Sequence, residues 1–551
     1  MKIFQKLSSL ALAALVITSC GNPAKMAEQA ELVSVNCDPQ VLEVVADKID
    51  AKVSVVIPAD YFHPKAVVEV TPVLVYEGGE SALEPVMLQG EDVTMNYTTV
   101  PETGATVTKD LKFDYKPGME KSHLELRMNI IYKDQTTPYP SPYKVADGAN
   151  TTYKLVKREG TLAYAPDAYQ AIIPETGEAQ ILYLINSSTV RPAQLKSDEI
   201  KAFQEFLKNV KADERREIVG TDIIAYASPD GKEDLNSKLS GKRAESATKA
   251  FNSKINTKKV GIETSINSVS ISEDWDGFKE LVRNSNIADK DLILRVLEMY
   301  SDPIVREREI KNMSQVFTIL AKEILPQLRR ARFIANIEFK NYTDEELVAL
   351  VNENIEILDE EALLRAATLL KENDAKLTIY NKAIEKFNSD RAIINKAVVL
   401  LNMNNIAEAT SVLAQTADKN CPYYQNTLGV IALRNGDLAK AEAAFAKANI
   451  DAAKANLGTD NILKGEYQAA LNMLKGTQSF NEALANILTN NLDAASNILK
   501  DAKCPCKNYL KAIIAARQGK VEDARAALEV AKADEKLAAR AENDIEFAKV
   551  R

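Results

Sequence analysis

A pattern of three residues recurs five times between residues 404 and 528. Each copy has Gly or Asn first, Ala five positions later, and Leu or Phe four positions after that. Another small residue, Ala or Gly, stands seven positions before each copy. Small residues at fixed helical positions let the two helices of a hairpin approach closely, and a larger residue fills the gap to the next hairpin. The copies are Asn404/Ala409/Leu413, Gly436/Ala441/Phe445, Gly465/Ala470/Leu474, Asn490/Ala495/Leu499 and Gly519/Ala524/Leu528, and the preceding small residues are Ala397, Gly429, Gly458, Ala483 and Ala512.

The first positions of these copies are 32, 29, 25 and 29 residues apart. The repeats resemble the tetratricopeptide repeat (TPR), whose unit is longer at about 34 residues. The resemblance implies a curved solenoid whose concave face binds segments of a partner protein. We therefore predict an all-α, TPR-like solenoid over residues 343–551, and a plain helical bundle is the alternative.

The central segment, residues 179–340, alternates strands and helices. Ser197 is the expected N-cap of its first helix, and residues 236–252 are the expected second helix. An acidic helical insertion, residues 271–312, contains the only tryptophan, Trp275, which we interpret as a packing anchor. The segment is predicted to form a βαβαβ-type α/β sandwich with a further αβ unit. Its expected strands are ILYLIN (181–186), IVGTDIIAYA (218–227), IETSINSVSI (262–271) and ARFIANIEF (331–339).

Part of this segment resembles the OmpA-like, peptidoglycan-associating domain. The matching residues are Asn236, Leu239-Ser240, Arg243-Ala244 and the late Arg329-Arg330. In that family an aspartate and an arginine fifteen residues later bind the charged end of diaminopimelate in the peptidoglycan stem peptide. Ser228 stands at the aspartate position here, and the nearest carboxylate is Asp230. The resemblance implies a peptidoglycan-binding site composed of Arg243, Asn236, Asp230, Ser228 and Leu239.

Two hypotheses follow from the serine at position 228. A hydroxyl supplies no charge for the ammonium of the ligand, and losing a charge-assisted hydrogen bond costs about 1.5–3 kcal/mol. Asp230 replaces the missing carboxylate in the first hypothesis. In the second, the Ser-Pro-Asp-Gly turn directs Asp230 to local backbone N–H groups, and the fold is kept as a docking or scaffold domain. The insertion at residues 271–312, which could cover the ligand groove, favours the second.

The N-terminal segment, residues 45–175, has apolar residues at every second position, interrupted by turn clusters. The clearest runs are VEVTPVLVY (68–76), LKFDY (111–115) and LELRMNIIY (124–132). This pattern predicts an antiparallel β-sandwich. Pro72 interrupts the first run, which indicates an edge strand or a bulge. The whole chain is thus predicted to be a multidomain α+β protein.

The N-terminus indicates export and lipid attachment. Lys2 and Lys6 precede the short apolar run LSSLALAALVI, as in a secretory signal peptide of residues 1–19. The sequence Ile-Thr-Ser-Cys-Gly, residues 17–21, resembles the lipobox of bacterial lipoproteins. The resemblance implies that Cys20 is acylated, with palmitate among its chains, and begins a linker of residues 20–44. Gly21 in place of aspartate implies the outer membrane, and the lack of acidic residues directly behind it implies the periplasmic face.

The composition argues against several classes of function. The net charge of −9 gives no electrostatic basis for binding nucleic acid. The two histidines, His63 and His123, lack partners at metal-ligand spacing, and Cys504-Pro-Cys506 is too tight for a zinc pair. We expect no metal, no cofactor and no enzymatic activity. The pairing of Cys37, Cys421, Cys504 and Cys506 into disulfides stays open.

Two functions are compatible with these observations. In the leading hypothesis, the protein is a non-enzymatic outer-membrane lipoprotein that tethers or scaffolds the cell envelope. Its central domain contacts peptidoglycan, and its repeats bind an envelope protein. In the alternative, the protein is an accessory subunit of an outer-membrane export, insertion or fimbrial assembly, and its OmpA-like domain no longer binds peptidoglycan.

Overall fold

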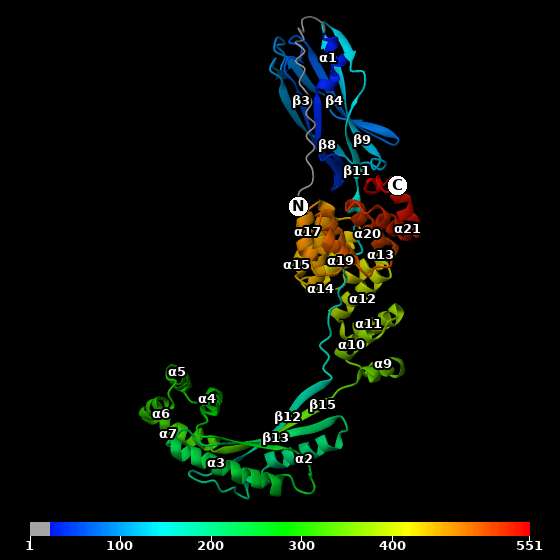
Figure 1. Cartoon of the computed structure of the whole chain (residues 1–551). Helices are drawn as coiled ribbons and strands as arrows, with labels where there is room; N and C mark the ends of the chain where they lie inside the picture. Colours follow the sequence, from blue (N-terminus) through cyan, green and yellow to red (C-terminus); the bar gives the residue numbers. More distant parts are fainter. Residues whose placement is uncertain (1–22) are drawn as a thin grey trace. The chain divides into compact units, whose positions relative to one another are not determined.

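The computed structural model describes residues 23–551, which divide into two compact units (Figure 1). The sandwich–repeat unit joins the residues up to Ala165 with Phe387–Arg551, and the α/β unit is Pro166–Lys386. The predicted signal peptide and the acylated Cys20 lie outside the described residues. Within residues 23–551, no helix combines the length and the apolar character that crossing a lipid bilayer requires.

The N-terminal part of the sandwich–repeat unit is rich in strands, and the three clearest sequence runs fall in β4, β8 and β9. Side chains from β3 and β8 on one side and from β4, β6 and β9 on the other line one small, mainly apolar hollow, so these strands face one another. The described strands run in the order β1-β3-β2-β11-β9-β4-β6-β7, with β8 beside β3, β5 beside β4 and β10 beside β9. Their bounds are β1 Ser34–Asp38, β2 Val41–Val45, β3 Lys48–Ile57, β4 Val67–Tyr76, β5 Gly79–Ala82, β6 Val86–Gly90, β7 Thr98–Val100, β8 Ala105–Asp114, β9 Ser122–Tyr132, β10 Gln135–Pro138 and β11 Tyr143–Asn150.

Pro72 lies in the central strand β4, so the prediction of an edge strand was wrong. On one side β4 pairs with β9 along its full length, including Pro72 opposite Leu126. On the other side its partner changes from β6, which ends its pairing at Val70, to β5, which begins at Val73. A proline is tolerated there because no strand requires an N–H donor between the two partners.

The α/β unit contains a four-stranded sheet in the order β12-β15-β13-β14, in which only β13 and β14 are parallel. Helices α2 and α3 lie along one face of this sheet (Figure 1). Ser197 caps α2, as predicted, and its Oγ accepts a hydrogen bond from the N–H of Ile200 at 3.2 Å. The first strand was predicted at residues 181–186, but β12 begins at Ile172 and ends at Leu182, so the prediction lay too far along the chain. The bounds are β12 Ile172–Leu182, α2 Asp198–Ala212, β13 Arg216–Tyr226, α3 Glu233–Ala250, β14 Ile266–Ile271 and β15 Arg330–Lys340.

The insertion between β14 and β15 forms a small helical subdomain that extends beyond the predicted residues 271–312. It has its own apolar core, which includes Phe278, Ile293 and Leu320. Trp275 packs at the border of this core, with its ring 5.7 Å from that of Phe278, as expected for a packing anchor. The helices are α4 Trp275–Asn284, α5 Lys290–Met299, α6 Pro303–Asn312, α7 Ser314–Glu323 and α8 Leu325–Leu328.

The C-terminal part of the chain is helical, and its helices pack in antiparallel hairpins. Helices α9 and α10 and nearly all of α11 belong to the α/β unit, and α12 to α22 belong to the sandwich–repeat unit. The bounds are α9 Asp344–Glu353, α10 Glu360–Leu369, α11 Asn373–Phe387, α12 Asp390–Asn402, α13 Ile406–Leu413, α14 Pro422–Arg434, α15 Leu438–Ala448, α16 Asp451–Lys464, α17 Tyr467–Leu474, α18 Phe480–Leu488, α19 Leu492–Leu499, α20 Pro505–Arg517, α21 Val521–Ala531 and α22 Glu535–Asn543.

The repeat pattern corresponds to the hairpins α12–α13, α14–α15, α16–α17, α18–α19 and α20–α21. The Gly or Asn at each first position lies in the turn with positive φ, the left-handed conformation that these two residue types tolerate best. The small residues lie at the contact between the two helices. A Cβ at Gly429 would lie 2.4 Å from the Phe445 ring, and one at Gly458 would lie 2.6 Å from Leu474. These distances confirm that small residues permit the close approach of the helices.

Candidate functional site

The predicted peptidoglycan loop connects β13 to α3 and is closed by its own hydrogen bonds. The Asn236 amide donates to the backbone carbonyls of Ser228 at 3.0 Å and of Gly231 at 3.1 Å. The Ser228 hydroxyl donates to the Asp230 carboxylate. Leu239, one turn further along α3, is half-buried. Asn236 therefore acts as an internal support of the loop.

The Asp230 carboxylate is held by a cation of the same domain. Arg329 Nη2 lies 3.3 Å from Asp230 Oδ2, and Arg329 Nε donates to the Ser228 hydroxyl at 3.3 Å. Lys311 of the insertion donates to the backbone carbonyl of Asp230 at 3.1 Å. The hypothesis that Asp230 satisfies backbone N–H groups is thus corrected: it pairs with Arg329, which reaches the loop from the residues just before β15.

Arg243 is directed into the protein. Its side chain is among the largest that are fully buried, with 1% of the residue exposed. Its guanidinium donates to three backbone carbonyls, those of Ser187 at 2.9 Å, Tyr226 at 2.9 Å and Leu184 at 3.2 Å. Burial lowers the pKa of Arg243 to about 10, which still leaves the side chain charged at neutral pH. Arg243 therefore connects the end of β13 to the loop that follows β12.

The helical insertion packs against the predicted site. Pro229 and Asp230 share a small hollow with Trp275, Ile310 and other apolar side chains of the insertion. The insertion is also fixed at its first helix, because Asp274 caps α4 and accepts from Arg330 Nη2 at 2.9 Å. The insertion thus lies on the loop where the OmpA-like resemblance placed the ligand.

A second candidate site lies in the sandwich–repeat unit, where the linker that leaves the sandwich follows the repeat helices. Three asparagines of α12, α16 and α18 each bind both main-chain groups of one linker residue. We call Asn395, Asn456 and Asn481 the asparagine clamp. Their Oδ1 atoms accept from the N–H groups of Ala165, Thr161 and Lys157 at 2.6, 2.6 and 2.8 Å, and their Nδ2 atoms donate to the carbonyls of the same residues at 2.9, 2.9 and 2.8 Å.

Further contacts hold the middle of the linker. Asn426 donates to the Thr161 carbonyl at 3.1 Å, and its own Oδ1 accepts from Asn456 at 3.0 Å. Gly160 has φ +73°, and a Cβ there would lie 2.9 Å from Val430. Arg434 donates to the Glu159 carbonyl at 2.7 Å. Because these bonds are made to the main chain, the three clamp asparagines do not select the side chains of Lys157, Thr161 and Ala165, whereas the contact with Val430 requires a glycine at position 160.

Sequence analysis did not identify the clamp, although the sequence contains a signal for it. Each clamp asparagine stands two residues before a small residue of the repeat pattern, as in Asn395-Lys-Ala397, Asn456-Leu-Gly458 and Asn481-Glu-Ala483. A polar residue that recurs on the same face of successive helices marks the surface that binds an extended chain. The concave face of the repeats was expected to bind a partner protein; in the structure, the asparagines of α12, α16 and α18 bind the main chain of the protein's own linker.

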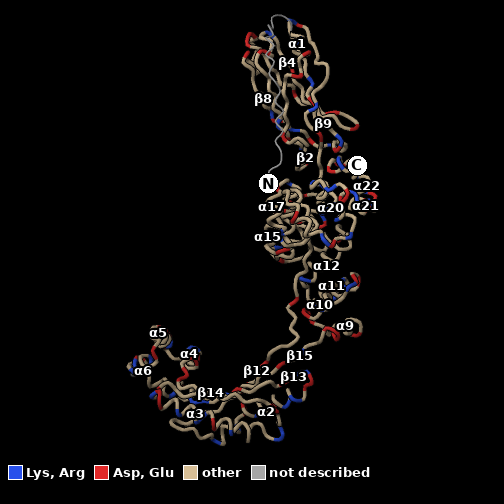
Figure 2. Tube along the Cα trace, in the orientation of Figure 1, with Lys and Arg blue, Asp and Glu red and all other residues tan. Residues whose placement is uncertain are grey.

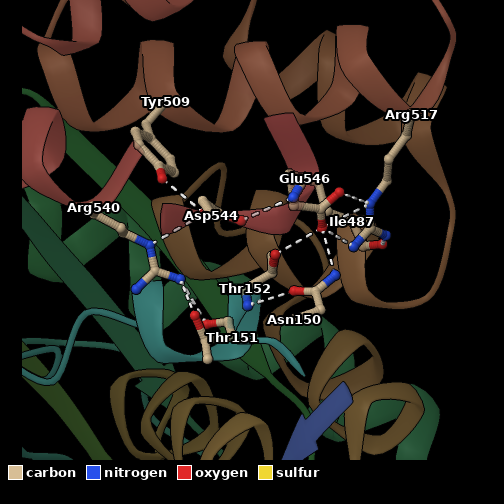
Figure 3. A network of polar contacts seen from close by, with 9 residues as sticks. All are labelled: Asn150, Thr151, Thr152, Ile487, Tyr509, Arg517, Arg540, Asp544 and Glu546. Atoms are coloured by element: carbon tan, nitrogen blue, oxygen red, sulfur yellow. Dashed lines mark hydrogen bonds and ion pairs between the residues drawn. The ribbon is translucent and has the colours of Figure 1, made fainter. Parts of the chain in front are cut away.

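The end of the sandwich is joined to the last repeat by a network of polar contacts (Figure 3). Glu546 is its centre, because its carboxylate accepts from Asn150 and Thr152, each at 2.8 Å, and pairs with Arg517. Arg540 donates to the carbonyl of Thr151 at 2.8 Å. These bonds connect the end of β11 and the residues after it to α20, to α22 and to the turn after α22 that carries Glu546, so the sandwich and the repeats form one unit.

The carboxylates in this network have different electrostatic surroundings. Burial raises the pKa of Glu546, but Arg517 and the hydroxyl and amide donors outweigh this effect, and the pKa lies below its ordinary value. Burial dominates at Asp544 and raises its pKa, although Arg540 and the Tyr509 hydroxyl lower it in part. Figure 2 shows that elsewhere the two signs of charge are mixed along both units. Among residues 23–551, no group of three or more His, Cys, Asp and Glu side chains is arranged to hold a metal ion.

Comparison with known proteins gives only distant structural similarity. No protein-family model and no curated protein matches the sequence. A tetratricopeptide repeat protein from Parabacteroides merdae is 14% identical, with a TM-score of 0.28 over 37% of this chain and 91% of its own. The APC/C hetero-tetramer Cut9–Hcn1 gives 13% identity and a TM-score of 0.32, over 58% of this chain and 71% of that chain. Both TM-scores are below 0.5, so neither similarity indicates a function.

Proposed function

We propose that this protein is a non-enzymatic, lipid-anchored scaffold of the bacterial cell envelope, and an accessory subunit of a protein assembly there. In this proposal its α/β domain does not bind peptidoglycan. The main evidence against peptidoglycan binding is the environment of Arg243. Its guanidinium is buried and donates hydrogen bonds to three backbone carbonyls. A ligand carboxylate would have to replace these bonds, and each carbonyl left without a donor would cost about 1–3 kcal/mol.

Asp230 supports the same choice. Its carboxylate already pairs with Arg329, and only 20% of its side chain is exposed. An ammonium group of the stem peptide would therefore have to compete with a guanidinium that belongs to the same domain. The insertion packed against Pro229 and Asp230 further restricts access to the loop.

The asparagine clamp supports a role as a scaffold. The clamp binds the linker from Lys157 to Ala165, and the Glu546 network binds Asn150 and Thr152 earlier in the chain. The path of the linker is therefore fixed at its start and along its length. A partner cannot use the same asparagines while the linker occupies them. We therefore infer that a partner protein contacts the outer helices of the repeats, α15 and α17.

Sedimentation with purified peptidoglycan sacculi tests the first part of the proposal. The mature protein is expected to stay in the supernatant, while an unrelated peptidoglycan-binding domain sediments as the positive control. Asp230→Asn is the informative variant because it removes the negative charge and keeps the size of the side chain. The proposal is wrong if the wild-type protein sediments, and the Asp230-dependent tether is then established if Asp230→Asn stays in solution.

Photocrosslinking in intact cells tests the position of the partner. A photoreactive residue at Lys447 on α15 or Gln468 on α17, both exposed, is expected to give adducts with an envelope protein. The matched control is Lys249, a likewise exposed position on α3 of the α/β unit. Adducts at Lys249 in the absence of adducts at Lys447 and Gln468 would contradict the assignment of the partner surface to the repeats.

A further inference from the structure

Two cysteines lie side by side at the start of α20. Cys504 is the N-cap residue of this helix, Pro505 occupies its first position, and Cys506 follows. The two Sγ atoms are 3.2 Å apart. Proline at the first helical position has a fixed φ that suits the start of a helix, so the local backbone keeps both cysteines in place. The short segment therefore holds two thiols within reach of each other.

The two thiols differ in exposure. Cys504 is exposed, whereas Cys506 is half-buried. A compound in solution therefore reaches Cys504 first, and Cys506 is placed to attack whatever becomes attached to Cys504. This is the arrangement of an attacking thiol and a resolving thiol in thiol–disulfide exchange.

The electrostatic surroundings support the same division. Burial raises the pKa of the Cys504 thiol, but the Lys507 N–H and the hydrogen bond with Cys506 outweigh it, and the pKa lies below its ordinary value. At Cys506, burial and the neighbouring Cys504 sulfur raise the pKa. Cys504 is therefore the thiol with the larger thiolate fraction at neutral pH, and the thiolate is the reactive form.

We propose that Cys504 and Cys506 form a reversible dithiol–disulfide site that reacts with low-molecular-weight disulfides. The Cys504 thiolate attacks one sulfur of the disulfide, forms a mixed disulfide and releases one thiolate. The Cys506 thiolate then attacks Cys504 Sγ, closes the Cys504–Cys506 bond and releases the second thiolate. Two electrons pass from the two cysteines to the compound, and the two cysteine protons go to solvent or to the released thiols.

The site is distinct from a metal centre and from the proposed scaffold function. Within residues 23–551, the two sulfurs are not part of any cluster of three or more potential metal ligands. The remaining described cysteines, Cys37 and Cys421, are free thiols in the same unit, and Cys37 is buried. Cys421 is a suitable control because it also precedes a proline at the start of a helix, α14, but has no second cysteine beside it.

Mass spectrometry of the full-length protein tests the proposal. The protein is equilibrated in buffers with different ratios of reduced to oxidised glutathione, quenched with acid, alkylated and digested with trypsin. Because Lys503 and Lys507 flank the pair, trypsin releases both cysteines in one peptide, residues 504–507. In oxidising buffer this peptide is expected to lack both alkyl groups and to be lighter by two hydrogens, and reduction should restore both alkylation sites.

Two variants separate the roles of the thiols. Cys506→Ser is expected to accumulate glutathione on Cys504, because no resolving thiol remains. In Cys504→Ser the alkylation of Cys506 is expected to be slower than that of Cys504 in Cys506→Ser, because Cys506 is half-buried and Cys504 is exposed. Cys421→Ser should leave the redox behaviour of the pair unchanged. The proposal is overturned if residues 504–507 stay alkylated at both cysteines in every buffer, or if oxidised Cys504 keeps its glutathione in the wild-type protein.

Discussion

Asn456 binds both main-chain groups of Thr161, a residue 295 positions earlier in the chain. Its Oδ1 accepts the Thr161 N–H at 2.6 Å, and its Nδ2 donates to the Thr161 carbonyl at 2.9 Å. The Asn456 residue is completely buried. One amide side chain thus satisfies a donor and an acceptor that an extended linker would otherwise leave to water.

Replacing Asn456 by Leu should release the linker. The variant leaves the Thr161 N–H without its acceptor, removes one of the two donors to the Thr161 carbonyl, and removes the donor to Asn426 Oδ1, so we expect a loss of about 1–3 kcal/mol. Trypsin should then cut faster after Lys157 and Arg158. Their side chains are exposed, but in the wild-type protein the clamp holds the main chain of this segment, beginning with Lys157 itself. The rate of appearance of the two fragments measures the effect.

The control for the clamp is Asn472→Leu on α17, where the asparagine is exposed and accepts a hydrogen bond from Gln468 on its own helix. This variant should be cut at the wild-type rate. Equal cleavage rates for Asn456→Leu and wild type would show that the linker is held without the clamp.

Replacing Glu546 by Gln should weaken the junction between the sandwich and the repeats. Removing one partner of a buried ion pair leaves Arg517 uncompensated, which costs about 3–5 kcal/mol. Hydrogen exchange of the backbone at residues 150–153 and 540–550 should increase at neutral pH. Glu217→Gln, which removes an exposed carboxylate paired with Lys340, is the matched control and should leave exchange at these residues unchanged.

The effect of Glu546→Gln should depend on pH in a defined direction. The pKa of Glu546 in the folded protein is below 4.5, its ordinary value, so its stabilising contribution is complete above about pH 4.5 and is lost as the pH falls through the folded-state pKa. The difference between wild type and variant should therefore shrink below about pH 4.5. Asp544→Asn should show the opposite trend, because burial raises the pKa of Asp544 and its charged form destabilises the fold as the pH rises.

Arg243→Met should destabilise the α/β unit. The three carbonyls lose the guanidinium as a donor, although the Leu184 carbonyl keeps the Ser187 N–H, and we expect a loss of about 2–3 kcal/mol. Trp275 is the only tryptophan and lies in this unit, so its fluorescence during urea unfolding reports this stability. If the variant is as stable as the wild-type protein, Arg243 is not a structural residue and is again a candidate for binding peptidoglycan.

Two glycines on helices should respond to alanine in opposite directions. At Gly458 a Cβ would lie 2.6 Å from Leu474 and 3.1 Å from the Ala470 carbonyl, so Gly458→Ala should destabilise the repeats by about 1–3 kcal/mol. At Gly241 on α3 nothing lies within 4 Å of the added Cβ, and Gly241→Ala should stabilise its helix by about 0.5–1 kcal/mol. Thermal unfolding followed by circular dichroism compares both variants with wild type.

Cys20→Ser tests the anchor. If Cys20 carries the acyl chains, wild-type protein labelled with a palmitate analogue should be found in the membrane fraction, and the variant should be unlabelled and soluble in the periplasm. Labelling of Cys20→Ser would contradict the assignment of the lipidation site.

The helical repeats and much of the order of strands and helices in the α/β unit were predictable from local sequence patterns. The repeat positions could be identified because each of them acts on its near neighbours. Gly or Asn adopts positive φ in the hairpin turn, and Gly429 or Gly458 lets a neighbouring side chain approach. Ser197 was identified as a cap for the same reason, since capping involves residues only three positions apart.

The contacts of the candidate site residues, in contrast, depend on the tertiary structure. Arg243 matches a ligand-binding pattern, but its partners are carbonyls that lie 17 to 59 residues away, and the sequence contains no indication of them. Thr161 binds Asn456 of the clamp and the neighbouring Asn426, and Glu546 binds Asn150 across 396 residues. Local patterns arise from helix and turn geometry, which a few neighbouring residues define. The occupancy of a groove and the burial of a guanidinium depend on contacts between distant segments, which form only when the whole unit folds.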